Sequence, residues 1–156
     1  MKYTLYFAPG ACSFVPHAML EVANANFEPR MVKLHKGEQH SPAYTAINPR
    51  GQVPVLVRQA DADTPVVLTQ IVAIVNYLNE AFPAAQFLPT EPMAKAQALS
   101  TLAWMNNTVH TTFTHIFMPQ KYSATPETQA DLKRFNTALY AKLLSELDAM
   151  AQAMQR

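Results

Sequence analysis

The chain has 156 residues, of which 49% are hydrophobic and 15% charged, and its formal net charge is +1 at pH 7. This length and apolar content suffice for the core of one domain or of two small ones. A charge so near zero, with no block of Lys and Arg, excludes the basic surface of a nucleic-acid-binding protein and the polybasic anchor of a membrane-associated one. The partners we expect are small molecules or proteins.

The N-terminal sequence and the cysteine content indicate a cytoplasmic protein. The opening letters, MKYTLYFAPG, hold too short an apolar run for a signal peptide, and no apolar run in the sequence is long enough to span a membrane. Cys12 is the only cysteine, so the sequence allows neither an internal disulfide nor a zinc site built on several cysteines. We therefore expect a free thiol in a reducing compartment, and no metal.

The first half of the sequence predicts strands and helices in the order β-α-β-α-β-β-α. Aromatic and β-branched residues in alternation indicate short strands, and a proline in the second strand indicates a sheet edge. The expected strands are Lys2–Phe7, Phe27–Leu34, Val55–Val57 and Pro65–Thr69, the last after a polar hairpin at 58–64. The expected helices run from a Ser13 cap to 24–26 and from a Thr69 cap to Phe82, with at most a short helical turn in the polar loop between the second and third strands.

The second half of the sequence predicts helices only. Prolines punctuate residues 83–92, which we take as a linker between a domain at 1–82 and a helical part at 93–156. One long helix is expected over Met93–Phe117. A second is indicated by an apolar stripe at helical spacing, formed by Leu132, Phe135, Leu139, Leu143, Leu147, Met150 and Met154.

The position of Cys12 suggests chemistry. It follows a Pro-Gly turn and precedes a predicted helix, within reach of that helix's first free N–H groups. Such amides stabilise a thiolate, so we expect a lowered thiol pKa and a nucleophile at neutral pH. The alternative is a small buried apolar residue, which is the common role of a free cysteine.

Two further segments indicate a binding edge. The junction Val53–Pro54, which enters a predicted strand, is a candidate cis peptide. It would leave a backbone N–H and C=O facing outward to pair with an extended peptide ligand. At Gln70–Ile71 the free N–H groups of a helix start could bind a carboxylate, although every helix has such a start.

Taken together, the segments YFAPGACSFVPHAMLE, INPRGQVPVL and LTQIVAIVNYL resemble bacterial glutathione S-transferases of the beta class, the class with a catalytic cysteine. The resemblance extends over residues 1–90 and continues weakly through AWMNNTVHTTF. It implies an α/β thioredoxin-like N-terminal domain with a mixed four-stranded sheet, followed by an all-α C-terminal domain that is here shortened to about two long helices. It also implies glutathione as the co-substrate.

The resemblance assigns roles to individual residues. Cys12 meets the glutathione sulfur, with Ser13 as a hydrogen-bond donor to either sulfur, and His110 lies near the thiol with Asn106 one helical turn away. The remaining implied contacts are all to the glutathione backbone and its carboxylates, and they fall on Lys36, Gln52, Val53, Pro54, Gln70 and Ile71. His17 is expected to be a packing residue.

The sequence departs from the family pattern in two places. Gln70–Ile71 replaces the usual Glu followed by Ser or Gly. A neutral hydrogen bond from Gln70 in place of a charge-assisted one would weaken affinity by roughly 1 kcal/mol, and Ile71 sets a bulky side chain beside the ligand. The sequence also stops before several helices of its relatives, so apolar helix surface would lie bare. We expect a homodimer to cover that surface; the alternative is that the sequence is a fragment of a longer protein.

These features predict a glutathione transferase in detoxification, which conjugates glutathione to a small apolar electrophile at Cys12. Two alternatives remain. One is glutathione-dependent disulfide reduction through a mixed disulfide at the same sulfur. The other is a non-catalytic relative retained for binding or assembly.

Overall fold

The computed structural model describes residues 2–59 and 64–153, and these divide into two compact units between residues 98 and 99. The tip of the predicted hairpin at 60–63, and Met154 at the end of the predicted stripe, lie outside the described residues.

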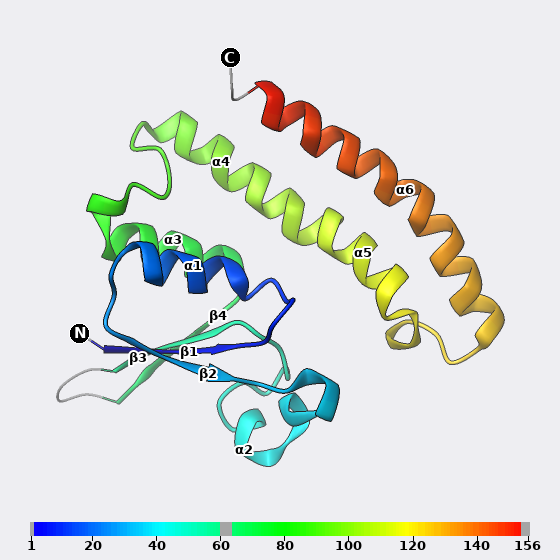
Figure 1. Ribbon diagram of the computed structural model, residues 1–156, viewed down its shortest axis with the longest axis horizontal. Coiled ribbons are helices and arrows are strands. Elements are labelled where there is room, and N and C mark those ends of the chain that lie inside the picture. Colours follow the sequence, from blue (N-terminus) through cyan, green and yellow to red (C-terminus); the bar gives the residue numbers. More distant parts are fainter. Residues whose placement is uncertain (1, 60–63, 154–156) are drawn as a thin grey trace. The chain divides into compact units, whose positions relative to one another are not determined.

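The first unit is built on a four-stranded mixed sheet, as predicted. Its strands lie in the order β2-β1-β3-β4, with β1 parallel to β2 and antiparallel to β3, and with β3 antiparallel to β4. Helices α1 and α3 lie side by side on one face of the sheet, and the short α2 lies beyond the other face (Figure 1). The bounds are β1 Lys2–Phe7, α1 Phe14–Val22, β2 Phe27–Met31, α2 Pro42–Thr45, β3 Val55–Gln59, β4 Val66–Thr69 and α3 Ile71–Ala81.

The core of the first unit lies between the sheet and this helix pair. Its side chains come from both, and those with almost no exposed surface include Leu5, Leu20, Leu56, Ile74 and Leu78. The aliphatic spacing of α3 therefore buries one face of that helix, as its sequence indicates. This packing fixes the two helix starts against the strand ends.

Several predicted boundaries were wrong; the third strand, for example, runs to Gln59 and not to Val57. The second strand ends at Met31 and not at Leu34, because the Lys33 N–H bonds the Glu38 carboxylate at 2.8 Å and the chain turns away into a 3-10 helix at Leu34–Lys36. The cap of α3 is Gln70 and not Thr69, because Thr69 is still paired in β4, opposite Val55.

The segment after α3 is attached to that helix. Residues Pro83–Ala85 form a 3-10 turn, the Asn79 side chain accepts a hydrogen bond from the Leu88 N–H at 2.9 Å, and Lys95 forms an ion pair with Glu80. Helix α4 spans Pro92–Trp104, and these contacts join its first residues to the first unit. The border between the compact units consequently lies within α4, at 98/99.

The second unit is a pair of helices. The predicted helix 93–117 is present but is interrupted by a π-helical turn at Met105–Val109, after which α5 runs over His110–Phe117. Helix α6, Pro126–Ala153, lies along α5 (Figure 1). Within the predicted stripe Leu143 is buried, whereas Phe135 is 71% exposed and does not belong to the packed face. No helix in the described ranges has both the length and the apolar character needed to cross a membrane.

Candidate active site

The predicted binding segments of the first unit converge at one end of the sheet. Tyr6 of β1 pairs with Val55, the first residue of β3, and Val55 pairs in turn with Thr69, the last residue of β4. The parallel pairing of β1 with β2 brings the chain out of β2 at the same end. The segments that meet there are the turn with Cys12, the loop with Lys36, the Val53–Pro54 junction and the Gln70–Ile71 helix start.

Cys12 lies in the turn between β1 and α1. Gly10 has φ +69°, which a residue without a Cβ adopts freely, and the Ala11 N–H bonds back to Ala8 at 3.3 Å. The free thiol is neither fully buried nor fully exposed, and its Sγ donates to the Val53 carbonyl at 3.8 Å. The cysteine and the predicted binding edge are thus in direct contact.

The expectation of a lowered thiol pKa was wrong. Burial raises the pKa of Cys12 above its ordinary value, and the backbone N–H groups of Cys12 and Ser13 oppose that rise without overcoming it. The helix start therefore does act on the sulfur as expected, but the loss of solvent outweighs it. In the protein without ligand Cys12 is a neutral thiol at pH 7.

Ser13 holds the turn. Its side chain is completely buried, and its Oγ both accepts from the Ala8 N–H and donates to the Ala8 carbonyl, each at 3.1 Å. The predicted side-chain cap on α1 was wrong for the same reason, because the hydroxyl bonds backwards and not to the helix. In this geometry the hydroxyl fixes the cysteine turn to the end of β1.

The Val53–Pro54 peptide bond is cis. Pro54 is buried, Val53 packs against the cluster of Val32, Tyr44, Val55 and Val57, and the Gln52 side chain is exposed. The Gln52 carbonyl accepts two hydrogen bonds of 2.8 Å, from the Tyr44 hydroxyl and from the Asn48 amide. Two side chains therefore hold the backbone before Pro54.

Tyr44 and Asn48 were not identified from the sequence as site residues. The letters NPRG did contain a usable signal, since Asn before such a turn commonly bonds its own backbone two residues on. In the structure the Asn48 side chain accepts from the Arg50 N–H at 3.2 Å in this way. The hydrogen bond from Asn48 to Gln52 depends on the tertiary position of the loop and had no local signal.

Gln70 and Ile71 separate into two environments. Gln70 is exposed and adopts φ 71° and ψ 120°, a strained conformation for a residue with a side chain, of the kind that clusters at ligand sites. Ile71 is only 8% exposed and its side chain belongs to the core. The isoleucine therefore packs inward, and its position relative to the ligand stays a prediction.

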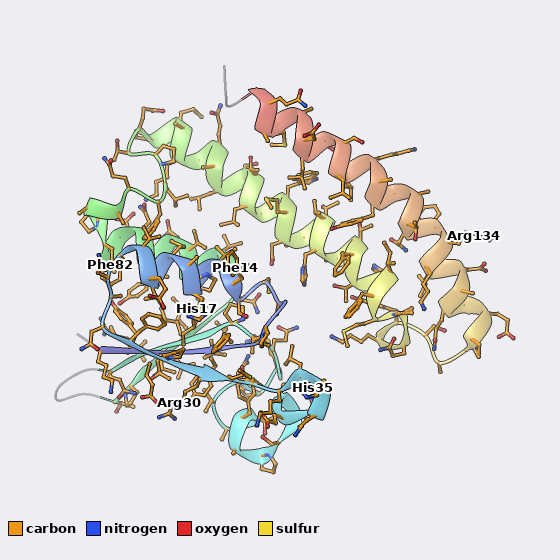
Figure 2. All side chains as sticks on the ribbon, in the orientation of Figure 1. Phe14, His17, Arg30, His35, Phe82 and Arg134 are labelled. Carbon is orange, nitrogen blue, oxygen red and sulfur yellow. The ribbon has the colours of Figure 1, made fainter. Side chains whose placement is uncertain are left out.

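Lys36 is exposed in the 3-10 turn at Leu34–Lys36, which ends at Gly37 with φ 72°. His17 lies on α1 (Figure 2). Its ring lies between Phe7 and Phe27, at centroid distances of 4.8 and 5.6 Å, and its Nε2 is 3.6 Å from Glu21. The prediction of His17 as a packing residue is confirmed. The exposed side chain of Lys36 leaves its charge available to a ligand at the protein surface.

His110 and Asn106 belong to the second unit. His110 is exposed at the start of α5, and Asn106 lies in the π-helical turn, where its amide donates to Asn107 at 3.4 Å. Single π-helical turns inside longer helices are frequent at functional sites. The assigned role of His110 stays a prediction.

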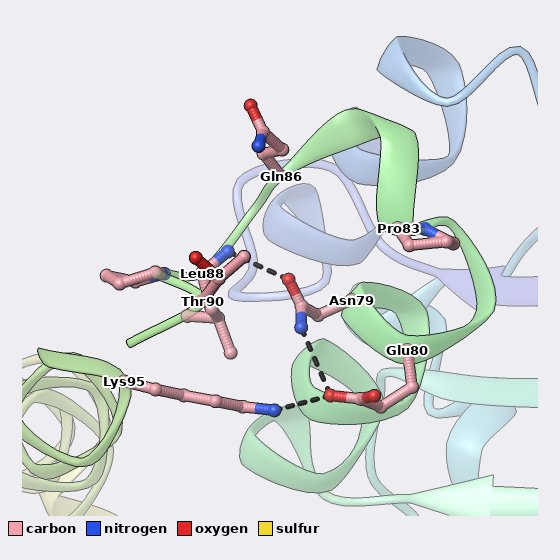
Figure 3. A pocket seen from close by; sticks show the side chains of 8 residues that line it. Asn79, Glu80, Pro83, Gln86, Leu88, Thr90 and Lys95 are labelled. Atoms are coloured by element: carbon pink, nitrogen blue, oxygen red, sulfur yellow. Dashed lines mark hydrogen bonds and ion pairs between the residues drawn. The ribbon is translucent and has the colours of Figure 1, made fainter. Parts of the chain in front are cut away.

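A cavity of about 220 Å³ lies elsewhere in the first unit, at the far end of α3 from Ile71 (Figure 3). Its lining includes Asn79, Glu80, Leu88 and Lys95, whose polar groups already bond one another or the backbone. Within the described ranges no three His, Cys, Asp or Glu side chains gather as metal ligands would. At the strand ends, in contrast, the side chains of Lys36 and Gln70 are exposed.

These features define the class of protein as a thioredoxin-like domain followed by helices. The sequence profile described as "Glutathione S-transferase, N-terminal domain" matches residues 1–80. The chain belongs to the glutathione S-transferase family.

Individual relatives agree with this assignment. Glutathione S-transferase GstA of Escherichia coli is 33% identical over 136 residues, which cover 83% of this chain and 65% of GstA. Maleylacetoacetate isomerase maiA of Aspergillus fumigatus is 37% identical over 98 residues, 62% of this chain and 42% of that protein. The chain therefore spans less than two thirds of the length of these curated relatives.

Solved structures give the same picture. A glutathione transferase homologue from Sulfitobacter, solved with bound glutathione, matches with a TM-score of 0.83 and 30% identity over 92% of this chain and 67% of its own. The beta class glutathione S-transferase of Sphingomonas chungbukensis matches with a TM-score of 0.75 and 26% identity over 94% of this chain and 69% of its own. The thioredoxin-like N-terminal domain with a helical C-terminal part is thereby established.

Proposed function

We propose that this protein is a glutathione transferase of the cysteine type, close to the beta class, whose reaction centre is at Cys12. The observation that carries the proposal is the Cys12 sulfur, partly exposed and 3.8 Å from the Val53 carbonyl, within the domain that the family profile matches. The bound glutathione of the Sulfitobacter homologue supports the choice of ligand. Its thiol is expected to lie beside Cys12.

The proposed reaction uses Cys12 as a hydrogen-bond donor. Burial keeps its thiol protonated, so the S–H is available to a glutathione thiolate, and a hydrogen bond to a charged acceptor is among the stronger ones. The thiolate attacks an electrophilic carbon of an apolar co-substrate. A carbon–sulfur bond forms, and the leaving group departs with its electron pair or, at an activated double bond, the product takes up a proton.

The other predicted contacts complete the proposed site. The backbone of Gln52 and Val53 beside Pro54 would pair with the peptide backbone of glutathione. The Gln70 side chain and the Ile71 N–H would hold its γ-glutamyl end. The exposed ammonium of Lys36 suits the glycyl carboxylate.

The parts of the proposal beyond the first unit rest on the family. His110 is proposed to face the electrophile, with Asn106 nearby, and a homodimer is proposed to cover exposed apolar side chains of the second unit such as Phe117 and Phe135, each 71% exposed. A cytoplasmic location is proposed because one free thiol suits a reducing compartment.

A second candidate is glutathione-dependent isomerisation, favoured by the maleylacetoacetate isomerases among the relatives, at 35–37% identity. It uses the same ligand site, since glutathione adds to an activated double bond and leaves after rotation. Exchange with disulfides at Cys12 is a weaker alternative, because a raised thiol pKa leaves little thiolate to attack a disulfide.

The test is a calorimetric titration of reduced glutathione into the wild type, Cys12→Ser and Cys12→Ala, with turnover measured on chlorodinitrobenzene, on a cis-configured activated diene acid and on a mixed disulfide. We expect binding by all three proteins. Turnover of chlorodinitrobenzene should fall roughly tenfold or more in Cys12→Ala, the value of one hydrogen bond to a charged group, and less in Cys12→Ser, which keeps a donor. No binding of glutathione at millimolar concentration would leave only the non-catalytic alternative.

A further inference from the structure

The backbone before Pro54 is held by a pair of side chains that we call the Gln52 clamp, namely Tyr44 and Asn48. The Tyr44 hydroxyl and the Asn48 amide each donate to the Gln52 carbonyl at 2.8 Å. Tyr44 is 6% exposed and Asn48 is 2% exposed, so both donors act from the protein interior. Two buried donors on one carbonyl fix its direction more firmly than one.

The clamp itself is well supported. The Tyr44 ring packs in the cluster with Val32 and Val55 and meets the Tyr6 ring edge-on at 5.8 Å. The Asn48 N–H donates to the Tyr44 carbonyl at 2.9 Å, and its side-chain oxygen accepts from the Arg50 N–H. The side-chain amide is therefore oriented by a bond at its oxygen, which leaves its NH₂ group for Gln52.

Because the peptide bond is planar, holding the Gln52 carbonyl also sets the direction of the Val53 N–H. In a trans peptide the C=O and the following N–H point to opposite sides. The Gln52–Val53 bond is trans, whereas Val53–Pro54 is cis. A Gln52 carbonyl held inward by Tyr44 and Asn48 therefore turns the Val53 N–H outward, and the Val53 carbonyl, one peptide further on, receives the Cys12 S–H at 3.8 Å.

We infer that Tyr44 and Asn48 are positioning residues, which aim the Val53 N–H at the peptide backbone of bound glutathione and hold the Val53 carbonyl against the Cys12 sulfur. This inference rests on the proposed function for its ligand. Its effect on Cys12 does not, because the contact between the thiol and Val53 exists without ligand. The two parts can be measured separately.

The main variant is Tyr44→Phe, which removes the hydroxyl and keeps the packed ring, and Asn48→Ala is the second. The matched control is Tyr77→Phe, since the Tyr77 hydroxyl also bonds within this unit, to Tyr3 at 3.2 Å, but far along the sheet from the clamp. All variants are measured for thermal unfolding, for the Kd of reduced glutathione by calorimetry, and for the pH midpoint of Cys12 alkylation by iodoacetamide.

We expect the Kd of glutathione to rise about fivefold in Tyr44→Phe, the factor by which one ordinary hydrogen bond shifts an equilibrium. The alkylation midpoint should move to lower pH in both clamp variants, because a looser Val53 carbonyl no longer stabilises the protonated thiol. Tyr77→Phe should lose stability and leave both the Kd and the midpoint unchanged.

Wild-type Kd and wild-type midpoint in both clamp variants would overturn the inference. So would equal changes in Tyr77→Phe, because general loosening of the domain would then explain them. Failure of the wild type to bind glutathione would overturn the proposed function instead, and the clamp would then be judged on the alkylation midpoint alone.

Discussion

Replacing Ser13 by Ala should destabilise the protein and have no direct effect on the reactivity of Cys12. The Ser13 hydroxyl is completely buried and makes two hydrogen bonds of 3.1 Å to the backbone of Ala8, itself only 4% exposed. Each such bond contributes about 1 kcal/mol net, and a buried backbone group left without its partner loses at least as much. We therefore expect the free energy of unfolding to fall by about 2 kcal/mol.

In a chain of this size a loss of about 2 kcal/mol corresponds to a fall in Tm of about 4–8 °C. Thermal and urea unfolding followed by circular dichroism measure it. The matched control is Ser145→Ala in α6, where the hydroxyl also donates to a backbone carbonyl, that of Ala141 at 3.1 Å, but is exposed. That change should leave Tm within about 1 °C, since exposed substitutions usually alter stability little.

The opposite pattern would refute this reasoning. If Ser13→Ala keeps the wild-type Tm but changes the alkylation rate of Cys12, then the hydroxyl acts on the sulfur and not on the turn. Ser13 would in that case regain the donor role that the family resemblance assigns to it. Full retention of both properties would show that the two hydrogen bonds contribute nothing.

Three further outcomes are expected. Iodoacetamide should alkylate Cys12 more slowly at pH 7–8 than it alkylates free cysteine, and equal rates would contradict the buried thiol. A raised thiol pKa favours the folded state only below the unfolded pKa, so the free energy of unfolding should fall as pH rises above the ordinary value of 9.0. Gln70→Gly should keep or raise Tm by relieving a positive φ but weaken glutathione binding severalfold, whereas Gln86→Gly, at φ 48°, should share only the first effect. Leu78→Ala should cost about 2–5 kcal/mol in denaturant unfolding because Leu78 is fully buried, against little for Leu144→Ala, which is 47% exposed, and comparable losses would contradict the assigned core.

Much of the fold followed from local pattern. Strand β1 was predicted with its observed bounds, Lys2–Phe7, because aromatic and β-branched alternation is a signal carried by the strand itself. The convergence of the binding segments followed from the order of the elements, because the end of β1, the end of β2, the start of β3 and the end of β4 all lie at one end of the sheet. The exit of β2 did not, because it depends on the Glu38 side chain reaching the Lys33 N–H from five residues away.

The site was predicted less well than the fold, and for a consistent physical reason. Cys12 was located correctly at the turn, but the direction of its pKa depends on how much protein surrounds the sulfur, which no local pattern reports. The inward packing of Ile71 is likewise a tertiary fact. The backward bond of Ser13 to Ala8 is local, but the Pro-Gly turn that makes it possible competes with the helix cap that the sequence also allows.

The raised thiol pKa also changes how two sulfurs share this site. If Cys12 were a thiolate, a glutathione thiolate beside it would meet a like charge in a partly desolvated place, and each would raise the pKa of the other. A neutral Cys12 removes that conflict, because it supplies the S–H that a single incoming thiolate needs and already directs it at the Val53 carbonyl in the free protein. When glutathione binds, the Cys12 S–H would donate to the glutathione thiolate in place of the Val53 carbonyl, and a charged acceptor makes the stronger hydrogen bond. The pH dependence of conjugation should consequently follow the ionisation of bound glutathione, and its acid limb should move to higher pH in Cys12→Ala, which removes the donor; an unmoved limb in that variant would contradict Cys12 as a neutral donor.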